Sequence, residues 1–282
     1  MSDKKREIAF CTTVTESYYK EFLLLKYSAE QYHKCRWVIS CDKGIYDKIK
    51  YDVNVDALFN IHIQREGDHV TGTDEDAKNF NDTTFTKFES CRFSIEKYGY
   101  AIFLDSDTFF VNPLEEKFFR MVENSDIRLM ASPHYSDNAL SIADAGYYNS
   151  GMFVIKCEEI LDRWQVLSFF QKDLNLYFEQ KPLEFIVREH FVVDLPFNYN
   201  LGWWRFDGDM VYDRLKYLKL RENKIYIGDY PVVNFHVHML KELKYGNMGD
   251  FFKIIILNLL EKSKNSKYTD LFEYYTTLEG EP

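Results

Sequence analysis

Short apolar runs alternate with amphipathic stretches in the first part of the chain. Residues 8–14 form an apolar, β-rich run that is typical of a buried strand. Residues 17–32 place apolar side chains at helical spacing, and residues 36–41 form a second apolar run. A strand, a helix and a second strand in this order predict parallel strands with helices on the faces of the sheet.

The same alternation continues along the chain. Residues 85–98 predict a helix, which Gly99 is placed to end. The uninterrupted apolar run at residues 100–104 predicts a strand, and further strands are predicted at residues 151–155 and 232–238.

No repeat and no linker rich in Gly, Ser or Pro divides the chain. We therefore expect one α/β domain over residues 1–250, with a helical segment at residues 251–282 packed on it. The polar, acidic stretch at residues 64–84 predicts a solvent-exposed loop, and the alternative is a mobile lid or an acceptor-binding loop.

The composition excludes several classes of protein. The chain has 282 residues, of which 46% are apolar and 17% aromatic, so it can bury a sizeable core and is not globally disordered. Its net charge of −10 disfavours nucleic-acid binding, which normally requires a basic surface. The five cysteines are scattered and form no C-x-x-C pair, which disfavours a disulfide framework or a structural zinc site.

The sequence also predicts a cytoplasmic location. Scattered cysteines indicate reduced thiols, and the polar first residues lack the apolar region of a signal peptide. The longest apolar stretch, residues 251–260, is interrupted by Lys253 and Asn258 and is too short to cross a bilayer. We therefore expect no transmembrane segment.

The candidate chemistry begins with an acidic pair. Of three Asp-x-Asp pairs in the chain, only Asp105 and Asp107 directly follow an apolar strand. Ligands of open α/β sheets bind beyond the carboxyl ends of the strands, where two carboxylates are costly to desolvate unless a cation is present. Hard oxygen ligands suit Mg²⁺ or Mn²⁺, and either ion can bridge a diphosphate.

Two alternatives account for the pair without such a metal site. The aspartates would simply cap the next element, because Pro113 and Glu115 indicate that one begins soon afterwards. The other alternative is a phosphatase with a nucleophilic strand-end aspartate, but that pattern requires Thr or Val where this chain has Phe109.

The segment around the acidic pair, residues 102–114, resembles the metal-binding segment of GT-A fold glycosyltransferases, and most closely that of glycosyltransferase family 8, the glycogenin-like enzymes. Four other segments resemble this family in the same order, at residues 12–19, 83–88, 149–151 and 195–201. The resemblance extends over most of the chain. It implies the GT-A fold, a Rossmann-like nucleotide-diphospho-sugar transferase fold whose mostly parallel central sheet is flanked by helices.

The resemblance implies that Asp105 and Asp107 bind Mn²⁺ or Mg²⁺ and that they and Ser106 contact a UDP-sugar. The family takes a third metal ligand from a His on its last strand, but Asn234 stands at that position in this chain. His236 and His238 follow, and by strand periodicity they share a face with Asn234. We expect His236 to be the ligand, with His238 next, and the alternative is a packed or solvent-facing pair of histidines.

The resemblance implies further contacts to the donor. Lys87 would face the active site, Asn149 would bind sugar hydroxyls, and Lys241 lies near the place of a family lysine that pairs with the diphosphate. The residues expected around the uridine are Thr13, Thr15 and Tyr19. Each of these residues also has a simpler explanation as a surface charge, a turn residue or part of the core.

The catalytic group is less well determined. Glu179, Gln180 and Glu184 lie where the family places an acidic or amide pair, and the alignment does not choose between them. A retaining transfer needs little protein base, because the leaving phosphate helps to deprotonate the acceptor, and the family likeness favours this course. An inverting enzyme needs a carboxylate base, for which the candidates are Glu184, Asp144, Asp207 and Asp209.

Trp203 and Trp204 precede Asp207 and Asp209 and form an aromatic and acidic cluster, with Phe206 and Tyr199 nearby. Aromatic faces stack on sugar rings and carboxylates bind hydroxyl groups, so this cluster is a candidate acceptor site. Packing in the core is the alternative.

Together these patterns predict a metal-dependent glycosyltransferase that moves a sugar from a UDP-sugar to a glycan or another hydroxyl acceptor, with retention. The alternatives are an inverting enzyme and a non-catalytic module that binds sugar nucleotides or glycans. A nucleotidyltransferase is disfavoured, because residues 11–15 contain no Gly for a phosphate-binding loop.

Overall fold

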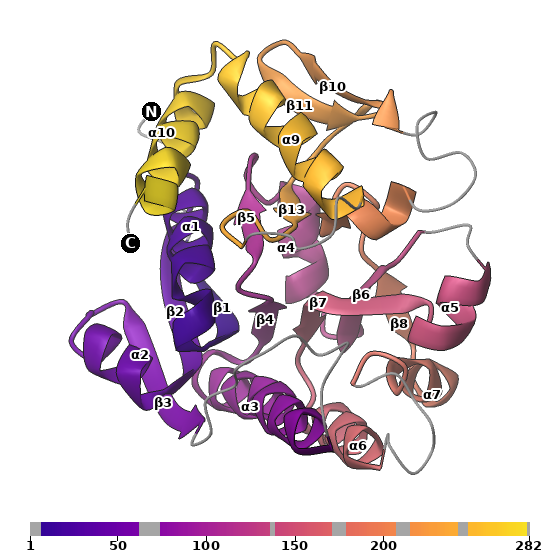
Figure 1. Cartoon of the computed structure of the whole chain (residues 1–282). Coiled ribbons are helices and arrows are strands. Elements are labelled where there is room, and N and C mark those ends of the chain that lie inside the picture. Colours follow the sequence, from indigo (N-terminus) through magenta and orange to yellow (C-terminus); the bar gives the residue numbers. More distant parts are fainter. Residues whose placement is uncertain are drawn as a thin grey trace.

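The chain folds around a seven-stranded sheet (Figure 1). This computed structural model describes residues 7–61, 74–135, 139–170, 179–206, 215–241 and 248–280. The strands lie in the order β3-β2-β1-β4-β7-β6-β8. Their bounds are β1 Glu7–Val14, β2 Lys34–Asp42, β3 Val55–Ile61, β4 Ala101–Leu104, β6 Leu129–Pro133, β7 Tyr148–Ile155 and β8 Val192–Asp194.

The sheet is mostly parallel, as expected. β3, β2, β1 and β4 run in the same direction, and β8 is parallel to β6. β7 alone in this sheet is antiparallel to both of its neighbours, β4 and β6. The order reverses between β1 and β4, and in open α/β sheets such a point is where ligands bind, beyond the carboxyl ends of the strands.

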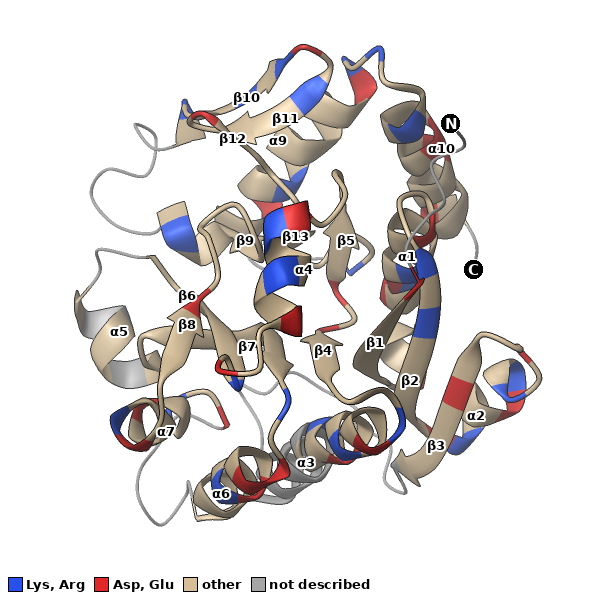
Figure 2. Ribbon diagram, turned by 180° about the vertical axis from the view of Figure 1, so that it is seen from behind, with Lys and Arg blue, Asp and Glu red and all other residues tan. Residues whose placement is uncertain are grey.

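Helices cover both faces of the sheet, because successive strand residues point to opposite sides. Ile102 and Leu104 pack in one hydrophobic cluster with side chains of α1, α2 and α4, whereas Ala101 and Phe103 pack in another with α3, α6 and α7. β4 and β7 carry no charged residue, whereas charges lie on the outer strands β2 and β3 and on the surrounding helices and loops (Figure 2). The bounds of these helices are α1 Tyr19–Glu30, α2 Lys43–Ile49, α3 Asp74–Tyr98, α4 Glu116–Glu123, α6 Glu158–Phe169 and α7 Leu183–Glu189.

Two smaller sheets and the last two helices share a third hydrophobic cluster. One sheet has the order β5-β13-β9, with β5 Thr108–Phe110, β13 Asn234–His236 and β9 Leu201–Gly202. The other is antiparallel and consists of β10 Leu218–Arg221, β11 Lys224–Ile227 and β12 Tyr230–Pro231. The helices α9 Met248–Glu261 and α10 Ser266–Gly280 contribute side chains to the same cluster, which also contains Phe109 and Phe235. The remaining elements are α5 Ala139–Ala145 and the 3₁₀ helices η1 Glu16–Tyr18 and η2 Trp203–Phe206.

Most of the expected elements are present, with two differences. α3 begins at Asp74, so the expected loop does not extend to residue 84, and residues 62–73 lie outside the described part of the chain. A polar start misled the prediction, because acidic residues are favourable in the first turn of a helix. β13 ends at His236, so strand geometry does not extend to His238. The expected division into a domain at residues 1–250 and a helical segment at residues 251–282 stays a prediction. α9 spans residue 250 and shares a hydrophobic cluster with residues from the earlier part of the chain.

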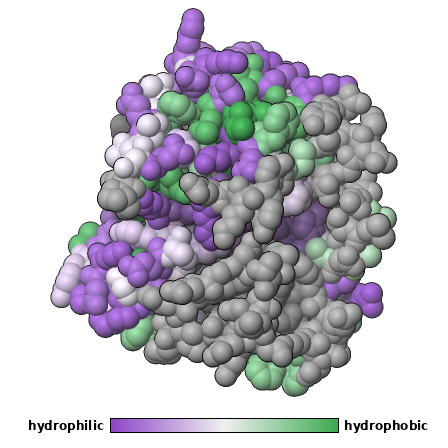
Figure 3. Space-filling model, viewed as in Figure 1, coloured by the Kyte–Doolittle hydropathy of each residue, from purple (hydrophilic) through white to green (hydrophobic). Residues whose placement is uncertain are grey.

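α9 presents apolar residues to solvent as well as to the core. Phe251 and Ile254 are exposed, and hydrophobic side chains gather over this helix in the space-filling view (Figure 3). Even so, no helix within the described ranges combines the length and the apolar character that crossing a membrane requires.

Neighbouring phenylalanines on α9 test this packing. Phe252 is fully buried, with its ring centroid 5.3 Å from Phe206 and 5.7 Å from Phe235, whereas Phe251 is 40% exposed. We expect Phe252→Ala to lower the free energy of unfolding by about 3–5 kcal/mol, because it leaves a cavity in the third cluster. The matched control Phe251→Ala should change it by less than about 1 kcal/mol. Urea denaturation measures both, and equal losses would contradict the packing.

Candidate active site

Two sheets meet at the acidic pair. Asp105 directly follows β4, and Asp107 directly precedes β5. β5 pairs with β13 so that Thr108 lies opposite His236, and the backbone N–H of Val237 donates to the carbonyl oxygen of Asp107 at 3.0 Å. The pairing therefore holds a histidine from near the end of the chain beside the aspartates.

Asp105, Asp107 and His236 lie close enough together to hold a metal ion. One ligand atom from each side chain lies within 4.8 Å of the other two. His236 Nε2 is 3.3 Å from Asp107 Oδ1 and 3.7 Å from Asp105 Oδ2. Two carboxylates and an imidazole form a donor set that suits a divalent ion of the first transition series, including Mn²⁺.

The other two candidates for the third ligand occupy different places. Asn234 accepts a hydrogen bond from the backbone N–H of Asn200 at 3.0 Å, so its oxygen is used in joining β13 to the chain before β9. His238 Nδ1 lies 3.2 Å from Asp107 Oδ2, whereas His236 lies beside the other oxygen, Oδ1. His236 and His238 thus both reach the acidic pair, whereas the side-chain oxygen of Asn234 is engaged elsewhere, and the choice of His236 as the third ligand stays a prediction.

The pKa values follow from burial and from these contacts. Burial raises the pKa of Asp105. For Asp107 burial also acts to raise the pKa, but the neighbouring His236 and His238 outweigh it and hold this pKa well below its usual range. Burial acts to lower the pKa of His236, but Asp107 outweighs it, so this pKa is raised.

Lys87 lies on the α3 side of the acidic pair. Its buried ammonium is 2.7 Å from Glu179 Oε1 and 3.4 Å from Asp105 Oδ1, and it lies 4.6 Å from the ring centroid of Phe103. Burial acts to lower its pKa, but the carboxylates of Asp105 and Glu179 outweigh it and raise this pKa, so Lys87 is a cation. Lys87 therefore lies beside Asp105, and its contact with a donor stays a prediction.

Glu179 is a buried counterion whose part in the site was not resolved from the sequence. It accepts hydrogen bonds from Lys87 at 2.7 Å and from the Ser150 hydroxyl at 2.7 Å. Burial acts to raise the pKa of Glu179, but Lys87 outweighs it and lowers this pKa. With Asp105, Asp107 and Glu179 ionised, one Lys87 leaves the cluster negative, which favours a cation there.

Two glycines allow close packing around His236. A Cβ atom on Gly151 would lie 2.2 Å from His236 Cε1, and one on Gly202 would lie 2.1 Å from the indole of Trp204. The Trp204 ring in turn stands edge-on to His236, with 4.8 Å between centroids. Trp204 was expected in an acceptor site, and the structure places it against the imidazole.

The rest of the expected acceptor cluster is only partly described. Trp203 is 38% exposed, and its ring centroid lies 6.3 Å from that of Trp204. Asp207 and Asp209 lie outside the described residues. A cavity of about 390 Å³ lies beside η2, and aromatic side chains line much of it, including Tyr135, Phe197 and Tyr217.

The residues expected around the uridine lie at the carboxyl end of β1. Thr13 faces Thr86, with 3.5 Å between hydroxyl oxygens, and the Thr15 hydroxyl is 3.2 Å from that of Ser17. Lys48 lies 4.8 Å from the ring centroid of Tyr19. Lys241 instead lies 3.5 Å from the ring centroid of Tyr18, a residue that the sequence did not single out.

Of the candidate bases, the structure describes the contacts of Glu184, and these are to residues other than the candidate metal ligands. Glu184 accepts a hydrogen bond from the backbone N–H of Tyr147 at 2.9 Å and pairs with Lys181 at 3.2 Å. Asp144 belongs to α5, but its side chain lies outside the described part of the structure. Ser106 is buried between the two aspartates.

A buried carboxyl group fixes the segment that follows β13. Glu21 on α1 accepts hydrogen bonds from the backbone N–H groups of Leu240 at 2.9 Å and Met239 at 3.3 Å. His238 Nδ1 lies 4.0 Å from its carboxylate. Burial raises the pKa of Glu21 to about 7. No pattern in the sequence indicates this contact, which joins residues far apart in the chain.

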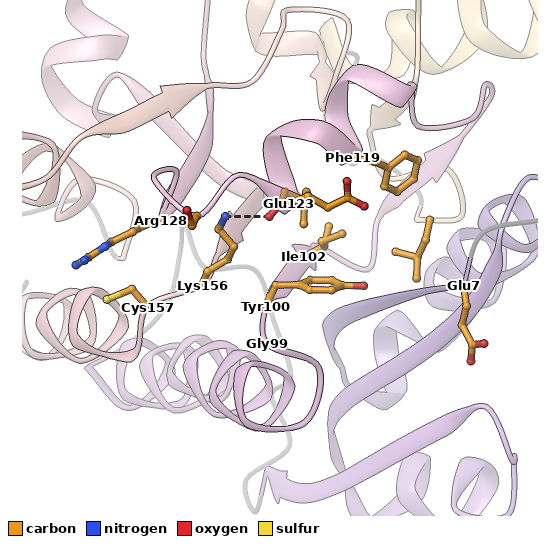
Figure 4. A pocket seen from close by; sticks show the side chains of 12 residues that line it. Glu7, Gly99, Tyr100, Ile102, Phe119, Glu123, Arg128, Lys156 and Cys157 are labelled. Carbon is orange, nitrogen blue, oxygen red and sulfur yellow. Dashed lines mark hydrogen bonds between the residues drawn. The ribbon is translucent and has the colours of Figure 1, made fainter.

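A larger cavity, of about 600 Å³, lies at the amino ends of the strands, opposite the acidic pair (Figure 4). It is lined by Gly99 and Tyr100 before β4, by Glu7 at the start of β1 and by Lys156 after β7, so it lies at the amino end of β4. Lys156 Nζ donates to the carbonyl oxygen of Val122 at 2.9 Å near the end of α4, a contact that caps this helix. Ligands of open α/β sheets bind at the opposite edge.

The fold is that of solved glycosyltransferases, whereas the sequence alone finds no relative. No protein family model matches the chain, and no curated protein is similar to it. A galactosyltransferase, LgtC, solved with donor and acceptor sugar analogues, superposes with a TM-score of 0.54 at 12% identity, over 98% of this chain and 98% of that one. The glycosyltransferase GlyE of Streptococcus pneumoniae TIGR4 gives 0.56 at 12% identity, over 98% of this chain and 65% of that one.

Mouse xyloside xylosyltransferase 1 gives a TM-score of 0.50 at 10% identity, over 82% of this chain and 97% of that one. At such identities the likeness shows the fold alone. It confirms the expected GT-A fold.

Gly151 tests the packing around His236. We expect Gly151→Ala to push the imidazole away from Asp107, because the added methyl group would overlap it. A crystal structure of the variant measures the displacement, and thermal unfolding should show a loss of about 1–3 kcal/mol. In the control Gly280→Ala, the added Cβ meets nothing within 4 Å, so neither quantity should change. An unmoved His236 would show that the site is not closely packed.

Glu21 predicts a pH dependence of stability. Its pKa is about 7 in the folded protein and ordinarily 4.5. Between these values the folded state binds more protons than the unfolded state, so this group's contribution to stability falls as the pH rises. The free energy of unfolding of the wild type, relative to Glu21→Gln, should fall by about 1.4 kcal/mol for each pH unit in this window. Urea denaturation at several pH values measures it, with the exposed Glu159→Gln as control, and parallel curves for the wild type and Glu21→Gln would contradict the prediction.

Proposed function

We propose that this protein is a metal-dependent glycosyltransferase that moves a sugar from a UDP-sugar to a hydroxyl acceptor, with retention of anomeric configuration. The observation that carries the proposal is the cluster of Asp105, Asp107 and His236 at the carboxyl end of β4, where the fold binds ligands. LgtC, GlyE and the mouse xylosyltransferase share this fold and are glycosyltransferases by name.

Asp105, Asp107 and His236 would hold the ion, which we propose to be Mn²⁺ or Mg²⁺. When bound, such an ion supplies Lewis-acid stabilisation of the charge that develops on a departing diphosphate. Ser106, Thr13, Thr15, Tyr19 and Lys241 would complete the nucleotide site. The free thiols of all five cysteines are consistent with a cytoplasmic, reducing environment for the enzyme.

Lys87 and Asn149 would act on the sugar side of the site. Lys87 is a fixed cation beside Asp105, so it stabilises negative charge without moving a proton. Asn149 Oδ1 already accepts hydrogen bonds from the Gly151 N–H at 2.9 Å and from Asn200 Nδ2 at 2.8 Å. Asn149 would therefore offer the sugar an N–H donor rather than an acceptor oxygen.

Retention is supported by how the described carboxylates are engaged. Asp105 and Glu179 contact Lys87, and Glu184 is held by Lys181 and a backbone N–H. A base that deprotonates the acceptor should be free to take a proton. In retaining transfer the leaving phosphate serves that purpose, whereas inversion would need one of the candidate bases Glu184, Asp144, Asp207 or Asp209.

Asp107→Asn tests the proposal, because it removes charge from the metal site while keeping the shape of the side chain. The variant and the wild type are titrated with Mn²⁺ by calorimetry and assayed for UDP release from UDP-glucose, UDP-galactose, UDP-xylose and UDP-N-acetylglucosamine. We expect Mn²⁺-dependent UDP release to fall by at least about 100-fold. The exposed Asp126→Asn is the matched control and should retain full activity.

Two results would contradict the proposal in different ways. Equal Mn²⁺ affinity in Asp107→Asn and the wild type would remove the metal site. Binding of UDP without turnover of any donor, with or without added acceptors, would favour a non-catalytic module that binds sugar nucleotides.

A further inference from the structure

Four buried side chains form a continuous run of hydrogen bonds that ends on His236. We call this run, made of Gln180, Asn149, Asn200 and His236, the amide relay. Asn149 Nδ2 lies 3.1 Å from Gln180 Oε1, Asn200 Nδ2 lies 2.8 Å from Asn149 Oδ1, and His236 Nδ1 lies 2.9 Å from Asn200 Oδ1. All four residues are at least nine-tenths buried.

The backbone fixes the direction of the relay at its start. The carbonyl oxygen of Ala145 lies 2.9 Å from Gln180 Nε2 and can only accept. Gln180 must therefore turn its amide nitrogen towards Ala145 and its oxygen towards Asn149. His134 agrees with this direction: its Nδ1 lies 2.8 Å from the carbonyl oxygen of Gly146, so Nδ1 carries the proton and Nε2 accepts from Gln180 Nε2 at 3.3 Å.

A second backbone group fixes the same direction independently. The N–H of Gly151 lies 2.9 Å from Asn149 Oδ1 and can only donate. Asn149 must therefore present its oxygen to Gly151 and also to the amide nitrogen of Asn200. The oxygen of Asn200 is then the atom that faces His236 Nδ1. Flipping either asparagine would bring two donors or two acceptors together at a buried position.

The relay determines which nitrogen of His236 carries a proton. Asn200 Oδ1 can only accept, so Nδ1 must donate. In the neutral ring, Nε2 then has a lone pair, and this is the atom 3.3 Å from Asp107 and 3.7 Å from Asp105. Taken alone, the two carboxylates would favour the opposite tautomer, with a proton on Nε2, and that proton would block a metal ion.

We propose that the amide relay holds His236 as the Nδ1–H tautomer against the attraction of the two aspartates, so that Nε2 is available to a divalent cation. Asn200 and Gln180 are then positioning residues of the metal site, acting through His236. Asn200 has the larger effect, because the Gly151 N–H still orients Asn149 when Gln180 is changed. The proposal concerns the site of the proposed function and rests on it for the identity of the ligand as a cation.

The first test needs no metal and no variant. Long-range ¹H–¹⁵N NMR of the metal-free wild type, at a pH where His236 is neutral, reports which ring nitrogen is protonated. We expect His236 to carry its proton on Nδ1. His134, which donates from Nδ1 to a backbone carbonyl, should show the same tautomer in the same spectrum and serves as the reference. A proton on Nε2 of His236 would overturn the proposal.

The second test uses three variants, with Mn²⁺ as the probe in calorimetry. Asn200→Leu removes the acceptor, so His236 should shift to the Nε2–H tautomer and the Mn²⁺ affinity should fall by about 10–100-fold. Asn200→Asp keeps an acceptor oxygen and should preserve the Nδ1–H tautomer. Gln180→Leu should lower the affinity by less than Asn200→Leu. Thermal unfolding identifies any variant that does not fold, in which case the wild-type spectrum decides.

The outcomes separate this proposal from the proposed function. If His236 is the Nδ1–H tautomer but the wild type does not bind Mn²⁺, the relay stands and the metal-dependent function fails. If Mn²⁺ binds but Asn200→Leu changes neither the tautomer nor the affinity, the metal site stands and the relay is overturned.

Discussion

The pairing of β13 with β5 is the constraint on which the rest of the site depends. β4 delivers Asp105, the chain turns through Asp107, and β5 then leaves the central sheet to pair with a strand from near the end of the chain. Only this pairing places His236 opposite Thr108, one residue beyond Asp107. β9, parallel to β13 on its other side, adds Gly202 and the adjoining Asn200 and Trp204 around the imidazole. The three-stranded sheet thus supplies His236 and the residues around its imidazole, which the central sheet alone does not provide.

The buried carboxylates at this site have positively charged or histidine partners on two sides. Lys87 on α3 is shared by Asp105 and Glu179, and His236 and His238 lie on opposite oxygens of Asp107. Removing ions from water is costly, and partial pairing recovers only part of that cost. The negative charge left over after Lys87 is counted explains why the cluster favours a cation. Lys87 itself is held from several sides, by Asp105, Glu179 and the carbonyl oxygen of Ser150.

Hydrogen-bond direction matters at this site as much as charge does. The amide relay transmits the fixed polarity of two backbone groups, Ala145 and Gly151, to a ring nitrogen. Each amide in it has only one orientation that satisfies its neighbours, since reversing it would bury two like groups face to face. Gly151 takes part both in the amide relay and in the close packing around His236. Its N–H orients Asn149, and its missing side chain leaves room for the imidazole.

The local elements of this protein can be predicted from its amino-acid sequence. The apolar run before Asp105 predicted β4 and the place of the acidic pair at its carboxyl end, because burial and strand length are local properties. The resemblance of short segments identified the fold and singled out Lys87 and Asn149. It did not determine how far α3 extends, since a polar helix start and a polar loop have the same composition.

Which residues meet at the site follows from the packing of distant segments against one another. The choice of His236 over Asn234 depends on the register between β13 and β5, which is set by packing across distant segments. Glu21 is joined to Leu240, Glu179 to Lys87, and Asn200 to His236 by contacts between residues far apart in the chain. No periodicity records such contacts, because a hydrogen bond between distant elements requires only one suitable residue on each, and their meeting is fixed by the fold as a whole.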